Sequence, residues 1–298
     1  MDNKIDNKNF DYKIYLFLNP DIIGDFSSIN FENESCKLMA WNHWVKHGKE
    51  EERAINIINT SKTHNGRFGN LFFINMMCHF LALKYDIKFD YKYEESFSKL
   101  GVHFYNGSQT YKEFIQLTDD NFLEKINFSH KPCNILINNY LWCQTSEFVE
   151  LLQKYWYSKL NKNQFKNNNK FYSRYKSNND LFIHVRLGDL FNKNMDLKNY
   201  YYKCLNTLKW SRGFISSDSV NSDFCKELIL NYDLNIVDEN EVDTILFAST
   251  CNNIVLSGGT FSWMIGFFAY DSSYIYYPLI KDPWYGRIFE PMNWKVII

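Results

Sequence analysis

The second half of this 298-residue chain alternates short β-rich runs with amphipathic stretches, and this alternation constrains the fold more than any other feature. Runs of four or five β-branched or aromatic residues are typical of buried strands, whereas apolar residues spaced three or four apart are typical of helices. The runs predict strands at 181–185, 213–216, 234–237, 253–256 and 274–277, and helices at 198–209, 223–231, 242–250 and 261–270. Strands that alternate with helices form parallel βαβ units. We therefore predict an α/β fold with an open, doubly wound sheet, which binds ligands beyond the carboxyl ends of its strands.

The first half shows the same alternation more weakly. It predicts strands at 55–58, 87–91 and 134–138, and a helix at 71–84. Residues 161–180 are polar and without periodicity, which indicates a boundary between two βα units.

At the start of the chain, aromatic residues at helical spacing end at Gly48 and predict a small helical appendage. Because the chain is longer than a single core usually supports, we predict three parts. They are the appendage over 1–54 and two Rossmann-like domains over 55–178 and 179–298, which face each other across a cleft.

Composition excludes several classes of partner. A net charge of −1 and a pI of about 6.7 give no general positive field that would collect nucleic acid. No apolar stretch is long enough to span a bilayer and the first residues lack a signal-peptide pattern, so we expect a soluble, cytoplasmic protein. The seven cysteines form no C-x-x-C pair and are expected to be buried thiols. Without a recognisable metal-ligand pattern, no metal site is expected.

Four polar segments follow predicted strands, and the segment from His184 to Asp189 is the most informative. The Arg186 guanidinium presents a planar fork of donors that can hold two phosphate oxygens. Gly188 allows the backbone to turn closely around a ligand, and Asp189 can orient either Arg186 or a substrate hydroxyl. An ion pair between the arginine and the aspartate that closes a loop is the competing interpretation.

Two further segments begin helices. In the segment 65–70, Gly66 and Gly69 let backbone N–H groups approach an anion, and Arg67 adds positive charge. In the segment 257–263, hydroxyls and glycines at a helix start offer donors to a phosphate. Ordinary turns and capped helices would show the same residue types.

The fourth segment, 216–219, places the Asp218 carboxylate where it can accept hydrogen bonds from a base or a ribose, although it could equally be a helix cap. Because all four segments follow strand ends in an alternating chain, we expect them to meet in one cleft.

With these segments in view, the chain resembles the inverting fucosyltransferases, above all the α-1,2-fucosyltransferase family. The segment 66–70, Gly-Arg-Phe-Gly-Asn, is similar to the "GRFGNQ" loop of the protein O-fucosyltransferases. The segment 184–189 is similar to "H-x-RRGD", 215–219 to "FSDD" and 257–263 to "SNSTFSWW". The matches are collinear, but Leu187 stands where the motif has a second arginine, and two glycines replace Asn-Ser.

The resemblance implies an enzyme with a GT-B-like architecture that transfers L-fucose, with inversion and without a metal or other cofactor. GDP-fucose would be the donor and a glycan hydroxyl the acceptor, with an α-1,2 linkage as the expected product. A glycosyltransferase for another GDP-sugar, and a non-catalytic GDP- or glycan-binding protein of the same fold, remain alternatives.

Carried over residue by residue, the resemblance implies two groups of site residues. The catalytic group is Arg186, Asp189 and His184, with the general base left open. The donor-binding group is Arg67, Gly69, Asn70, Asp218, Ser257, Thr260, Phe261 and Ser262. For the acceptor, Tyr91, Tyr93, Phe97 and Tyr105 could stack on a sugar face, but in a chain this aromatic such residues are more often core.

Overall fold

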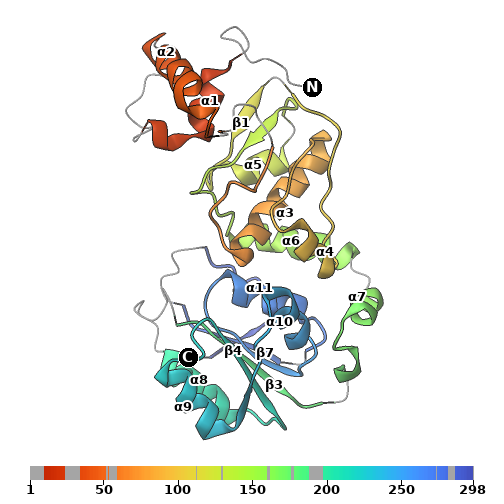
Figure 1. Cartoon of the computed structure of the whole chain (residues 1–298). Coiled ribbons are helices and arrows are strands. Elements are labelled where there is room, and N and C mark those ends of the chain that lie inside the picture. Colours follow the sequence, from red (N-terminus) through yellow and green to blue (C-terminus); the bar gives the residue numbers. More distant parts are fainter. Residues whose placement is uncertain are drawn as a thin grey trace. The chain divides into compact units, whose positions relative to one another are not determined.

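The computed structural model describes residues 10–23, 34–51, 53, 59–111, 113–128, 130–159, 162–175, 178–187, 197–272, 274–280 and 286–297 (Figure 1). The chain divides into two compact units, Met1–Asn59 and Thr60–Ile298. The strand predicted at 55–58 lies outside the described residues. None of the described helices combines the length and the apolar character needed to cross a bilayer.

The described part of the first unit is helical. Its elements are α1 (Tyr12–Leu18), η1 (Pro20–Ile22), α2 (Glu34–His43) and η3 (Trp44–Gly48). Asp11 begins α1 because its carboxylate accepts hydrogen bonds from the backbone N–H groups of Lys13 and Ile14. Tyr15 is fully buried and its hydroxyl lies 2.8 Å from Nδ1 of His43, which ties α1 to α2.

The second unit is built around a six-stranded sheet in which every neighbouring pair of strands is parallel. Its strands are β3 (Leu181–Val185), β4 (Gly213–Ser217), β5 (Leu234–Ile236), β6 (Asn253–Val255), β7 (Tyr274–Pro278) and β8 (Lys295–Ile297). The spatial order is β5-β4-β3-β6-β7-β8. Counted along the chain this is 3-2-1-4-5-6, the Rossmann order, which reverses between β3 and β6. The predicted parallel α/β fold is confirmed, and β8 is an additional strand.

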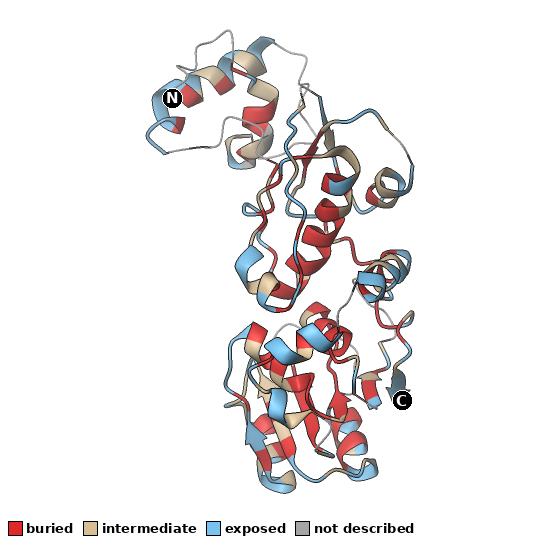
Figure 2. Cartoon of the chain, turned by 90° about the vertical axis from the view of Figure 1, so that its right-hand side faces the viewer, coloured by how far each residue is buried: buried red, intermediate tan, exposed pale blue. Residues whose placement is uncertain are grey.

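Helices cover both faces of this sheet (Figure 1). Leu181 and Ile183 of β3 belong to one core with α8 (Leu197–Thr207) and α9 (Asp223–Tyr232). Phe182, on the opposite face of β3, belongs to a second core with α10 (Glu241–Ala248) and α11 (Thr260–Phe268). Successive side chains of a strand point to opposite faces, so a strand buried on both faces reads as a continuous apolar run. Figure 2 shows these buried residues concentrated in the sheet and on the inner sides of its helices.

Residues 60–175 contain less regular structure. The elements are α3 (Phe68–Tyr85), α4 (Glu94–Lys99), β1 (Phe114–Gln116), α5 (Phe122–Asn127), β2 (Asn134–Leu136), α6 (Ser146–Lys159), α7 (Lys162–Asn168) and η4 (Tyr172–Arg174). Strands β1 and β2 pair in parallel, and two isolated parallel bridges join Thr60 to Asp90 and Ile87 to Gln109. A second doubly wound domain in this part of the chain stays a prediction.

One local prediction for this region was wrong. The strand predicted at 87–91 forms only the two isolated bridges, because its hydrogen bonds go to short irregular segments. The polar stretch 161–180, predicted as a boundary between two βα units, contains helix α7, in which the buried Phe165 stacks against Phe268 with ring centroids 6.2 Å apart.

Helix α3 joins the two regions of the second unit. Thirteen of its 18 residues are buried, so it is apolar around most of its circumference. Phe73 lies 4.8 Å from Trp263 of α11 between ring centroids, and one core extends across both helices. At the first turn, a Cβ on Gly69 would lie 2.5 Å from the backbone nitrogen of Phe261. The start of α3 and the start of α11 therefore touch through backbone.

A buried histidine links α3 to α6. Nδ1 of His79 accepts a hydrogen bond from the backbone N–H of Tyr105 at 2.8 Å, and Nε2 lies 2.6 Å from the Tyr155 hydroxyl. Burial, aided by the positive charge of Lys159, lowers the pKa of His79 to about 4. The ring is therefore neutral at neutral pH, with its hydrogen on Nε2, and it donates to the Tyr155 oxygen.

The contact between α3 and α11 predicts the effect of Gly69→Ala. The new methyl group overlaps backbone that cannot rotate away, so we expect unfolding free energy to fall by roughly 2–4 kcal/mol. Gly101→Ala is the control, because nothing lies within 4 Å of its Cβ position and only the φ of +75° opposes the change. It should cost about 1 kcal/mol. Denaturant unfolding of both variants measures the difference, and equal losses would contradict the close contact.

The depressed pKa of His79 predicts a pH-dependent stability. The unfolded chain takes up a proton near pH 6.5 whereas the folded chain resists protonation until about pH 4, so stability falls as the pH drops between these values. His79→Phe should remove about 2 kcal/mol of the loss between pH 7 and pH 5 while lowering stability at pH 7. Denaturant unfolding at several pH values tests this. His103→Gln, at an exposed histidine, should keep the wild-type slope, and an unchanged slope in His79→Phe would refute the explanation.

Candidate functional site

A cavity of about 470 Å³ lies at the carboxyl ends of β3 and β6, where the strand order reverses. Doubly wound sheets bind ligands at this switch point because the loops that leave the two strands diverge there. Eight of the eleven residues proposed from the sequence line the cavity: Arg67, Gly69, Asn70, His184, Arg186, Asp218, Thr260 and Phe261. Residues separated by almost 200 positions in the chain therefore meet in one site.

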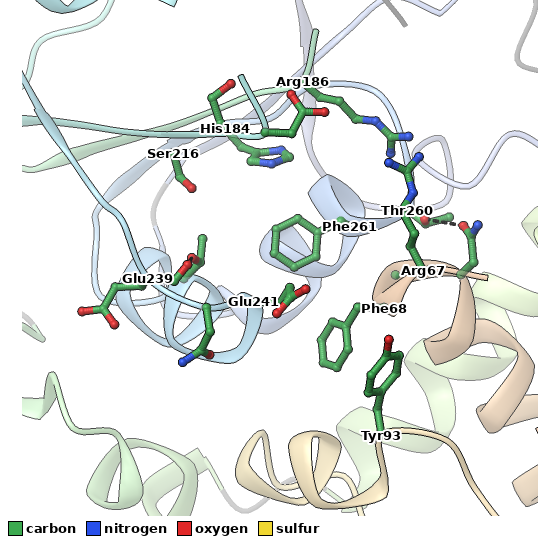
Figure 3. Close-up of a pocket in the computed structure, with 16 residues that line it drawn as sticks. Arg67, Phe68, Tyr93, His184, Arg186, Ser216, Glu239, Glu241, Thr260 and Phe261 are labelled. Atoms are coloured by element: carbon green, nitrogen blue, oxygen red, sulfur yellow. Dashed lines mark hydrogen bonds between the residues drawn. The ribbon is translucent and has the colours of Figure 1, made fainter. Parts of the chain in front are cut away.

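Two arginines form one wall of the cavity. Arg186 follows β3 and Arg67 precedes α3, and Figure 3 shows their guanidinium groups turned toward one another. Gly259 has a φ of +102°, and a Cβ there would lie 2.9 Å from Nη1 of Arg186. A side chain at this position would be both strained and in the way of the guanidinium. A guanidinium group binds oxyanions through paired N–H donors, so this wall favours an anion.

Helix starts add to the positive character of the same wall. Neither Arg67, at the start of α3, nor Gly259, at the start of α11, provides a side-chain cap hydrogen bond. The positive end of a helix dipole favours an anion. Asn70 Oδ1 accepts a hydrogen bond from Thr260 Oγ1 at 2.6 Å, drawn as a dashed line in Figure 3. It accepts a second from Gln144 Nε2 at 3.2 Å. These two hydrogen bonds fix the orientation of the Asn70 amide.

His184 is a buried, neutral member of the site. Its Nδ1 lies 3.2 Å from Ser257 Oγ, and its ring meets the Phe261 ring edge-on at 5.3 Å. Burial lowers its pKa to about 4, with the nearby Arg186 acting in the same direction and Asp218 opposing it. At neutral pH the imidazole therefore serves as an uncharged hydrogen-bonding group.

The structure does not bring Ser257 and Ser262 into the cavity. Both are fully buried, and Ser262 Oγ accepts a hydrogen bond from the Ser257 backbone N–H at 2.7 Å. The Ser262 hydroxyl thus holds the turn between β6 and α11, and the Ser257 hydroxyl contacts Nδ1 of His184. Asp189 and Gly188 lie outside the described residues.

Asp218 occupies the end of β4. Its Oδ1 accepts a hydrogen bond from the Leu187 backbone N–H at 3.2 Å, which joins the loops that follow β3 and β4. The Leu187 side chain is buried in the core formed with α8 and α9. Leu187, which stands where the fucosyltransferase motif has a second arginine, thus faces away from the cavity.

The cavity also has a polar rim that was not predicted from the sequence, formed by Glu239, Asn240 and Glu241 before and at the start of α10. Asn240 caps this helix through a 3.0 Å hydrogen bond from the Asp243 backbone N–H. Glu239 pairs with Lys170 at 3.1 Å. The same signal that identified the other segments, a polar cluster after a strand, was present here after β5.

Of the four aromatic residues considered for the acceptor, Tyr93 lines the cavity and the other three do not. Tyr91 and Phe97 are buried, and Tyr105 donates a hydrogen bond to Asp86 at 2.7 Å. Tyr93 is 45% exposed and lines the cavity beside Phe68, to which it packs edge-on (Figure 3). Its φ of +60° is unusual for an aromatic residue, and such strain is often found at binding sites.

Within the described residues, no three His, Cys, Asp or Glu side chains are grouped so that they could hold a metal ion. The charge available to an anion in this cavity comes from the arginines and helix starts. Comparison with known proteins finds no match for the chain among protein-family models, curated proteins or solved structures.

Proposed function

We propose that the chain is an inverting glycosyltransferase that binds a GDP-sugar in this cavity, with GDP-fucose as the leading donor. The observation that carries the proposal is the convergence of Arg186 and Arg67 with two helix starts at the switch point of the sheet. A diphosphate carries the charge and the paired oxygens that two guanidinium groups recognise. The resemblance to the fucosyltransferases supports guanosine and fucose as the remaining parts of the donor.

In the proposed reaction the acceptor oxygen attacks the anomeric carbon of the sugar from the face opposite the diphosphate. The bond between that carbon and the β-phosphate oxygen breaks, its electron pair stays on the departing GDP, and the proton of the acceptor hydroxyl passes to a general base. Arg186, Arg67 and the backbone N–H groups at the start of α11 stabilise the charge that develops on the leaving group. Prearranged electrostatic stabilisation of this kind is usually the largest contribution to catalysis.

The opposite rim of the cavity would hold the nucleoside. Asp218 follows the second strand of the sheet, the position at which Rossmann folds hydrogen-bond a ribose hydroxyl. Glu241 lies on the rim and could accept two hydrogen bonds from the Watson–Crick edge of guanine, which presents N–H donors there. Uracil lacks an amino group at this edge, so a carboxylate favours guanine.

The proposed architecture is GT-B-like. Residues 179–298 would form the donor domain, while the region before them would form the acceptor side and contribute Arg67 and Tyr93. The non-catalytic alternative is favoured by one observation, the absence of a second arginine side chain at position 187. Under the proposal, Arg67 supplies the second positive charge instead.

Arg186→Lys tests the enzyme proposal. A lysine keeps the charge but loses the paired donors, so we expect GDP to bind at least tenfold more weakly and turnover to fall at least 100-fold. Calorimetry with GDP and a GDP-release assay with GDP-fucose and GDP-mannose measure the two effects. Arg287→Lys is the matched control, because this exposed arginine pairs with Glu290 outside the cavity.

Near-wild-type turnover of Arg186→Lys would contradict the diphosphate assignment. GDP binding by the wild-type chain without transfer or hydrolysis of any donor would favour the non-catalytic alternative. If GDP is released faster from GDP-mannose than from GDP-fucose, mannose would replace fucose as the proposed donor sugar.

Glu241→Gln tests base recognition. Losing a charged acceptor should weaken GDP binding about 10- to 100-fold and reduce the preference for GDP over UDP. Pyrophosphate binding should be unchanged, because the arginine wall is intact. Glu150→Gln on α6, at an exposed carboxylate outside the cavity, is the control. If Glu241→Gln weakens pyrophosphate as much as GDP, this residue does not read the base.

A further inference from the structure

A second cavity, of about 480 Å³, lies between α4, α6 and α7. Figure 1 shows these three helices close together, and the segment containing Gly101 and His103 completes the wall. None of its lining residues belongs to the wall of the cavity at the switch point. It is a separate site that the proposed donor does not use.

The wall of the second cavity is positively charged and rich in hydrogen-bond donors. Lys99 and Lys159 line it together with His103, and no aspartate or glutamate does. In the part of the chain that the structure describes, neither lysine has a carboxylate within ion-pair distance. Two ammonium groups around one hollow favour a negatively charged occupant.

Its floor is aromatic. Trp156 and Phe165 are each 6% exposed and still contribute to the lining. The Trp156 indole N–H has no hydrogen-bond acceptor among the described residues, although it is buried. A buried donor without an acceptor is costly, and a ligand oxygen would remove the cost.

Tyr155 supplies a further donor. Because His79 accepts the Tyr105 N–H at Nδ1, its Nε2 hydrogen is directed to the Tyr155 oxygen. The hydroxyl hydrogen of Tyr155 therefore cannot point to His79, and no other described residue accepts it. Tyr155 lines the second cavity, so a ligand oxygen there can accept this hydrogen.

A small hollow of about 190 Å³ borders both cavities. It shares Phe68, Tyr93 and Glu241 with the cavity at the switch point and Lys99 with the second cavity. Helix α4, whose residues line the hollow and the second cavity, has six residues and is about 9 Å long. The two cavities therefore lie near one another, with this hollow beside both.

We propose that the second cavity binds an acidic sugar residue, one that carries a carboxylate or a phosphate group on a pyranose ring. The lysines bind the anionic group, Trp156 and Phe165 contact the apolar face of the ring, and the indole and phenol donors bind its hydroxyls. Its assignment as a subsite for the acceptor glycan rests on the proposed function. The glycan would place an acidic residue here and present a hydroxyl at the donor cavity.

The Trp156 indole signal reports on this cavity in NMR spectra of the full-length, ¹⁵N-labelled chain, with Trp156→Phe identifying the signal. We expect glucuronate and glucose 6-phosphate to shift it saturably, glucose to bind at least tenfold more weakly, and added salt to weaken the acidic ligands. The Lys99→Gln/Lys159→Gln double variant should lose at least tenfold in glucuronate affinity. Lys154→Gln, at an exposed lysine on α6 outside the cavity, should bind normally.

Three results would overturn the proposal: no shift of the Trp156 signal with either acidic sugar, equal affinity for glucose, or inorganic phosphate binding as tightly as glucose 6-phosphate. GDP titrations of the same samples separate this site from the proposed function. If GDP does not bind while glucuronate does, the donor assignment fails and the acidic-sugar site stands. If GDP binds and the acidic sugars do not, the acidic-sugar site fails and the donor assignment stands.

Discussion

The site depends on the backbone contact between the first turns of α3 and α11, where Gly69 lies against Phe261. Both helices begin at this point, and residues of both first turns line one cavity, so the positive ends of the two helices lie beside it. The aromatic core behind the contact, which includes Phe73 and Trp263, keeps the two helices from sliding apart. Packing deep in the core thereby determines where Arg67 lies relative to Arg186.

The second half of the fold was predictable because five of its strands are short apolar runs between turn residues, and helices such as α8 and α9 show a clear apolar face. The six-strand sheet differs from the prediction only by small shifts in strand ends and by β8, a three-residue edge strand near the end of the sequence. The first half was harder for a physical reason. Strands of three residues are too short to show alternation, and α3 is apolar all round, so periodicity says little about its faces.

The candidate site was predictable to the extent that one rule applies, namely that ligand-binding residues follow parallel strands. That rule brought His184, Asp218 and Thr260 together, and applied to β5 it would also have identified Glu241. Sequence could not show that the Ser257 hydroxyl turns toward His184 and away from the cavity, since a serine after a strand can point either way. Nor could it show the second cavity, whose walls come from three helices with no shared motif.

Local charge explains how a chain with a net charge of −1 can offer two sites for anions. At physiological salt, charges more than about 8 Å apart are largely screened at the surface, so what matters is the charge within each cavity. The two arginines line the cavity at the switch point and the two lysines line the second cavity, while Lys99 and Glu241 line the hollow beside both. Two anionic groups held together in one cavity would repel. Under the two proposals the countercharges lie in separate cavities, so a donor diphosphate and an acidic sugar would be able to bind at the same time.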